Sequence, residues 1–180
     1  MASLRALMLL SLLIFSASFA TGWSWAQETT PAAKESLNWN LEVPFLRIVL
    51  VNMAVGALLV CGGFSFGLIT ALALASNGLT WGIYLARSAG RLGLQQAMLL
   101  FVPHGVIELV GLLLLASGGF RIALRMVAHI RNPGSDLAIL PWATGWRTIL
   151  TGGTCILAGA LVESFLTLPV AKTLIASNWW

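Results

Sequence analysis

Charged side chains are scarce in this sequence. Ten lysines and arginines and six acidic residues make up only 9% of its 180 residues, whereas about a quarter of the residues of a soluble domain are charged. So few charges do not cover a surface that faces water, and the mean hydropathy is high, at +0.90. The composition therefore excludes a soluble globular protein and indicates an integral membrane protein with one membrane domain.

Cysteine is nearly absent as well. Cys61 and Cys155 both lie in apolar stretches, which is typical of small core residues and not of a disulfide framework or a metal pair. The net charge of +4 comes from residues scattered between apolar segments, so we expect no basic surface for nucleic acid. The chain also lacks a HExxH zinc motif, a P-loop and a dinucleotide fingerprint. We therefore expect no cofactor, no bound metal and no catalytic residue.

Five apolar segments are long enough to be candidate membrane spans, which predicts an all-α, polytopic helix bundle. Residues 1–22 are either an N-terminal transmembrane helix or a signal peptide, with a small-x-small cleavage site at Ser24, Trp25 and Ala26. Residues 23–43 form a polar linker, predicted to be extracytoplasmic. Residues 44–180 form the membrane bundle, with spans at 44–61, 64–86, about 98–117 and about 148–168.

Glycine and proline predict where these spans end. Gly62 and Gly63 separate the second span from the third, and Pro169 is expected to end the fifth. Asn77 and Gly78 are typical of a turn that breaks the third span, or of a helix end within the membrane. Residues 87–97 form a polar connection, residues 118–119 end the fourth span, and residues 120–130 continue as an amphipathic helix.

The side of the membrane follows from the arginines. Residues 120–147 are rich in arginine and are therefore expected to be cytoplasmic. Counting the spans backwards places the N-terminus inside and the linker outside. Arg87 and Arg91 then lie on the outer side, which disagrees with the preference of basic residues for the cytoplasmic side. The protein is predicted to lie in the cell (cytoplasmic) membrane, in contact with lipids.

Small residues recur every four positions in the third span. Gly63, Gly67, Ala71 and Ala75 form one series, and Gly78 and Gly82 repeat the spacing. Such stripes let helix backbones approach closely in a membrane. We expect the helix-packing glycines to be the following: Gly63, Gly67, Gly78, Gly82 and Gly105.

Polar side chains inside the spans are the candidate functional residues: Asn52, Asn77, His104, Glu108 and Glu163. Each needs a partner in hydrocarbon, so we expect them to converge in the interior of the bundle. His104 and Glu108 are one helical turn apart and share a face. Four interpretations stay open: a structural hydrogen-bond cluster, a proton or ion path, a metal site, and a cleft for a peptide or lipid.

The order and spacing of these residues resemble those of the stage II sporulation protein M family, also described as DUF95 integral membrane proteins. The resemblance rests on residues that span most of the chain: Asn52, Gly67, Asn77, Gly78, Gly82, Pro103, His104, Gly105, Glu108, Leu109, Glu163 and Pro169. It implies about five helices, with Asn77, His104, Gly105, Glu108 and Glu163 at signature positions.

The resemblance also implies a role. In endospore formers the family member acts during engulfment, as the membrane anchor of a complex with peptidoglycan-degrading enzymes; other relatives lie in circular bacteriocin gene clusters. We therefore expect a non-enzymatic scaffold or anchor for other membrane or envelope proteins, with oligomers also possible. The second hypothesis is a component of a transport or peptide export and immunity system, and the third is an intramembrane metal-dependent enzyme.

Overall fold

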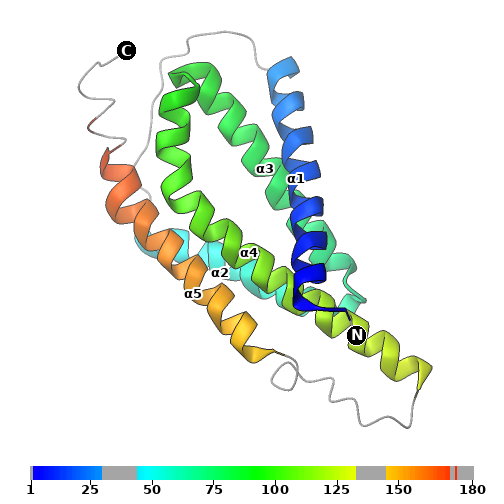
Figure 1. The fold of residues 1–180 in the computed structure, drawn as a ribbon. Coiled ribbons are helices and arrows are strands. Elements are labelled where there is room, and N and C mark those ends of the chain that lie inside the picture. The colour runs from blue at the N-terminus through cyan, green and yellow to red at the C-terminus, as the bar shows by residue number, and fades with distance from the viewer. Residues whose placement is uncertain (1, 30–43, 133–144, 171–172, 174–180) are drawn as a thin grey trace.

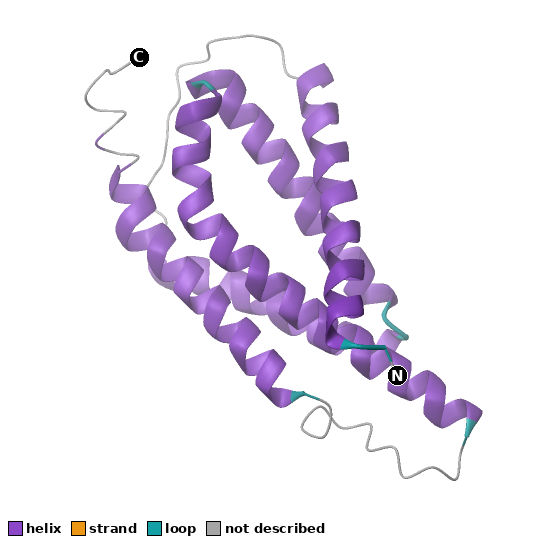
Figure 2. Cartoon of the chain, viewed as in Figure 1, coloured by secondary structure: helices purple, strands orange, loops and turns teal. Residues whose placement is uncertain are grey.

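The computed structural model describes residues 2–29, 44–132, 145–170 and 173. All regular structure in this part of the chain is helical (Figure 2). The elements are α1 (Leu4–Thr29), α2 (Phe45–Cys61), η1 (Gly62–Ser65), α3 (Leu68–Leu92), α4 (Leu94–Arg131), α5 (Trp146–Val162) and η3 (Glu163–Thr167). Five of the described helices are long and apolar enough to cross a membrane, which confirms the predicted polytopic bundle.

The helices pack as neighbours along much of their length (Figure 1). α1 lies beside α3, and α4 lies beside α5, with α2 behind them; α3 and α4 form a hairpin that turns at Gly93. The buried centre is apolar and is formed by these residues: Phe15, Leu59, Ala73, Leu74, Leu112, Leu115, Ala116 and Ile156. Phe15 comes from α1, so the N-terminal segment contributes to the core.

The third span is not broken at Asn77 and Gly78, as the sequence allowed, because α3 runs without interruption through both residues. The Asn77 side chain donates a hydrogen bond to the Ala73 carbonyl of its own helix, over 2.8 Å. Gly78 faces α1, and a Cβ added there would lie 2.5 Å from the carbonyl oxygen of Phe15. This glycine therefore serves the close approach of two helices and not a turn.

Gly118 and Gly119 do not end the fourth span either. α4 continues through them to Arg131 as a single helix of 38 residues. A Cβ at Gly119 would lie 2.1 Å from the carbonyl oxygen of Leu59, so the glycine lets α2 pack on the backbone of α4. Likewise α3 extends to Leu92, and the expected polar connection at residues 87–97 shrinks to the turn at Gly93.

The turn between α2 and α3 follows the predicted glycines. The 3₁₀ helix η1 starts at Gly62, and Phe66 and Gly67 then take positive φ angles of 56° and 84°. We expected no catalytic residue, yet residues 63–67 have the G-x-S-x-G spacing of a nucleophile elbow. That motif follows a strand, whereas this one follows the helix α2. The Ser65 hydroxyl donates to the Gly62 carbonyl and accepts from the Ile69 amide, so it closes the turn.

Of the glycines expected to pack helices, Gly63, Gly78 and Gly82 lie against the backbone of another helix. Gly67 lies against side chains of α4, since an added Cβ would be 3.1 Å from the Phe120 ring, and its positive φ also starts α3. Gly105 is a correction: the atoms nearest to an added Cβ belong to the Phe101 ring of the same helix, at 3.2 Å. It lines an apolar cavity of about 290 Å³ between α1, α3 and α4 and makes no close backbone crossing there.

Candidate functional site

Two prolines shape the helices that carry the acidic residues. Pro103 lies inside α4, one residue before His104. Proline has no N–H to donate and its ring clashes with the carbonyl four residues earlier, so it kinks a helix. Figure 1 shows α4 bending in its first half. The bend separates the start of α4 from α5 and leaves room on the face that carries His104 and Glu108.

Pro169 acts similarly in the last span. It does not end the span, as was expected, because helical structure continues to Val170. Instead the preceding turn, η3, is a π-helix in which the Leu168 N–H donates to the Glu163 carbonyl. A proline at 169 removes the regular donor to the carbonyl four residues earlier, and the wider turn relieves the crowding. π-turns inside α-helices are frequent at functional sites, and this one carries Glu163 and Thr167.

Glu108 lies at the centre of the polar residues. Its side chain is buried, with 6% of its surface exposed, and its carboxylate accepts a hydrogen bond of 2.8 Å from the Asn52 amide of α2. Glu163, from η3, lines the same cavity as Glu108. A Cβ at Gly159 would lie 2.2 Å from Cγ of Glu108, so the absence of a side chain there lets Glu108 cross α5.

His104 faces the same space one turn earlier on α4. Its Nδ1 lies 3.2 Å from the Thr167 hydroxyl, within hydrogen-bonding distance. On its other side, the ring centroid of Phe101 lies 5.9 Å away, and Phe101 in turn packs edge-on against Trp81 of α3 at 5.0 Å. The histidine thus connects the polar residues to an aromatic wall, which we define as Trp81 and Phe101.

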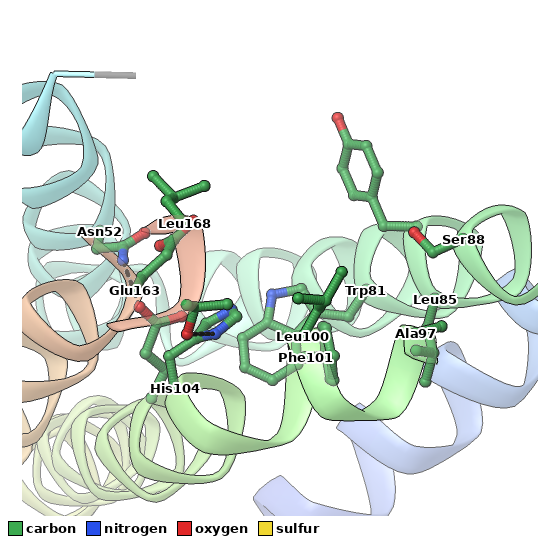
Figure 3. Close-up of a pocket in the computed structure, with 13 residues that line it drawn as sticks. Asn52, Trp81, Leu85, Ser88, Ala97, Leu100, Phe101, His104, Glu163 and Leu168 are labelled. Atoms are coloured by element: carbon green, nitrogen blue, oxygen red, sulfur yellow. Dashed lines mark hydrogen bonds between the residues drawn. The ribbon is translucent and has the colours of Figure 1, made fainter. Parts of the chain in front are cut away.

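These side chains enclose a cavity of about 350 Å³ between α2, α3, α4 and the end of α5. Figure 3 shows Asn52, His104 and Glu163 at one end and Leu85, Ser88 and Ala97 at the other, with the aromatic wall between them. The remaining lining residues are Tyr84, Leu100, Glu108, Thr167 and Leu168. No lysine or arginine lines this cavity among the residues that the structure describes.

The cavity is blind at its polar end. A second space of about 20 Å³, large enough for one water molecule, continues past Asn52 and Glu108 to Asn77. Beyond it lie Leu112 and Ile156 of the apolar core. The described residues therefore form a pocket with a polar floor and no polar route across the bundle.

The structure brings Asn52, Glu108 and Glu163 together, and places His104 on the same cavity. Asn77 lies at the small inner space and bonds its own helix. Four residues at the site were not predicted from the sequence: Trp81, Phe101, Thr167 and Gly159. A signal existed only for Trp81, which alone among the eight tryptophans lies inside a predicted span. No group of three or more potential metal ligands forms among the described residues.

A family model described as stage II sporulation protein M matches residues 11–168. The chain belongs to this family. The match confirms the resemblance, and it runs from within α1 to the last residue before Pro169. All residues that line the polar cavity therefore lie within the segment that the family model matches.

One relative is an uncharacterized protein of Methanocaldococcus jannaschii. It is 28% identical over 175 residues, which cover 93% of this chain and 97% of the relative. The two proteins therefore align over nearly the whole length of both chains. No solved structure matches significantly.

Proposed function

We propose that this protein is a scaffold or anchor in the cytoplasmic membrane for a multiprotein complex. The observation that carries the proposal is the length of α4, a single helix of 38 residues. At about 1.5 Å per residue such a helix measures about 57 Å, against about 30 Å for the hydrocarbon core of a bilayer. Its cationic end, residues 120–131, is well suited to lie outside the hydrocarbon as a docking surface.

The packing of α4 supports this role because it makes the projecting end rigid. Gly119 lies on the Leu59 carbonyl, and a Cβ at Gly63 would lie 2.4 Å from the Gly119 carbonyl. Contacts between backbones cannot adjust by rotating a side chain. The end of α4 is therefore held at a fixed angle to the rest of the bundle, which is what a scaffold requires.

The chemistry of residues 120–131 suits a protein or lipid surface. Leu124 and Ile130 are exposed, at 46% and 62% of their surfaces, and they share the segment with arginines that include the exposed Arg131. An apolar patch beside cationic groups fits a partner that carries acidic and apolar residues. Lipid phosphates are the simpler ligand for the same arginines.

The test is affinity purification from native membranes with reciprocal tagging. The variant Ile130→Asp with Arg131→Glu changes only the exposed end of α4, and Arg87→Glu on α3 is the matched control. We expect a defined partner to be lost from the α4 variant and kept by the control, at equal amounts of folded protein. If no protein is recovered reciprocally with the unchanged chain, or if both variants keep the same partners, the proposed scaffold role is wrong.

The cavity favours a component of a transport or export system as the second candidate. Carboxyl groups inside spans often mark substrate or ion paths, and a blind pocket fits alternating access better than an open pore. The measurement is flux of labelled substrates or protons in proteoliposomes. Lost flux in Glu108→Gln, with partner recovery unchanged, would favour transport over the scaffold.

A further inference from the structure

The cavity described above has the chemistry of a ligand site. Its volume of about 350 Å³ lies at the lower end of the range for small-molecule pockets, which are mostly apolar with a few placed polar groups. Tyr84, 63% exposed, stands at its rim, whereas Glu108 and Thr167 on the floor are buried. The pocket thus leads from the protein surface to a polar floor.

The charges at the polar end of the cavity determine which ligand groups can bind there. Glu108 and Glu163 both line that end of the cavity, and the neutral amide of Asn52 donates a hydrogen bond to Glu108. Two carboxyl groups in a low-dielectric site are stabilised by a proton or by a positive ligand. Among the residues that the structure describes, no lysine or arginine lines the cavity to neutralise these carboxyl groups.

The walls define the rest of the ligand. Trp81 of α3 and Phe101 of α4 pack edge to face along the cavity, with their ring centroids 5.0 Å apart. Aromatic faces attract ammonium groups as well as apolar chains. Along α4 the cavity reaches from Ala97 to Glu108, about 16 Å at 1.5 Å per residue. This shape fits an elongated molecule with one cationic end.

We propose that the cavity binds an amphipathic amine, whose ammonium group lies between Glu108 and Glu163 and whose apolar body lies along the aromatic wall. A zwitterionic phospholipid fits less well, because its phosphate would enter a cavity whose described lining offers two carboxyl groups and no lysine or arginine. The ligand class is therefore a monocationic amine with an aliphatic or aromatic body.

The experiment uses the purified full chain and octylamine, an amine that is protonated at pH 7, as the probe. A ligand that binds the folded state raises Tm in a concentration-dependent way. We expect octylamine to raise Tm, and octanol and octanoate, which have the same chain without the positive charge, to have no such effect. Equal shifts with octylamine and octanol would overturn the proposal and leave only an apolar crevice.

Variants locate the site. Glu108→Gln and Glu163→Gln keep the size of each side chain, and we expect the apparent affinity for octylamine to fall about tenfold or more, as for a lost close charge partner. Glu28→Gln, on the exposed end of α1, is the matched control and keeps the response. Ala97→Leu narrows the apolar part without touching the acids and should also weaken binding. Unchanged affinity in the double glutamine variant would refute the site.

The source of the amine is tested separately in nanodiscs. If phosphatidylethanolamine competes with octylamine and phosphatidylcholine does not, a lipid headgroup is the ligand and the preference for a simple amine is wrong. If neither lipid competes, the result supports a simple amine as the ligand. These measurements need no partner protein, so a failure of the proposed scaffold role would not change their outcome.

Discussion

Replacing Gly82 by alanine adds one methyl group at the closest approach of α1 and α3. The new Cβ would lie 2.1 Å from the carbonyl oxygen of Phe19 and 2.8 Å from the amide nitrogen of Trp23. Both are backbone atoms, so no rotamer change relieves the overlap. Ordinary Cβ contacts begin at 3.4 Å, so α1 has to move by more than about 1 Å, away from the core that Phe15 helps to form.

The magnitude follows from two opposing effects. Overpacking of a well-packed contact costs about 1–3 kcal/mol, and the upper half of that range applies because the obstacle is backbone. Alanine is favoured over glycine in a helix by about 0.5–1 kcal/mol, which offsets part of the cost. We therefore expect Gly82→Ala to lower the free energy of unfolding by about 1–2 kcal/mol, a factor of about 5–30 in the folded-to-unfolded ratio.

Gly90 provides the matched control on the same helix, because an added Cβ there meets nothing within 4 Å. Gly90→Ala should be neutral or slightly stabilising. Steric trapping or unfolding in sodium dodecyl sulfate measures the free energy of unfolding of both variants. Equal stabilities for Gly82→Ala and Gly90→Ala would show that α1 does not pack on α3 through this glycine.

Three further changes address the cavity. Gly159→Ala forces a shift of Glu108, so we expect lower stability by about 1–3 kcal/mol and a weaker octylamine response, whereas Gly153→Ala, which meets nothing within 4 Å, should change neither. Asn52→Ala removes the amide donor from the Glu108 carboxyl group and should cost about 1–3 kcal/mol, measured by the same unfolding assay; no loss would mean that the hydrogen bond is dispensable. Pro169→Ala restores a backbone donor and should raise Tm while weakening the octylamine response, because the π-turn that presents Glu163 is no longer required; unchanged Tm and binding would contradict this explanation of the turn.

Individual residues show which helix ends could be predicted from the local sequence. The predicted span at 44–61 agrees closely with α2, Phe45–Cys61. Pro44 and Gly62 flank this helix, and both affect the backbone only locally, so their effect can be predicted from the sequence. Gly119 was expected to end a helix, and Gly78 either to pack helices together or to break one, yet both lie inside helices. A glycine that ends a helix and a glycine that admits a second helix look alike in sequence, because the difference lies in a neighbour far along the chain.

The candidate site shows the same division. Glu108 and Glu163 could be singled out because a carboxyl group in an apolar segment is costly wherever the chain folds. Thr167 and Gly159 could not, since threonine and glycine are ordinary in membrane helices. Thr167 gains its role from the π-turn before Pro169, and Gly159 gains its role from the passage of Glu108.

The sequence by itself determined that this chain crosses the membrane about five times and that its few intramembrane polar groups must find partners, because both follow from the solvation of single side chains. Only the tertiary structure decided that Asn52 from α2 meets Glu108, that the pocket is blind, and that the aromatic wall leads to it. Those facts depend on contacts between distant segments, where the fit of one helix against another sets the geometry.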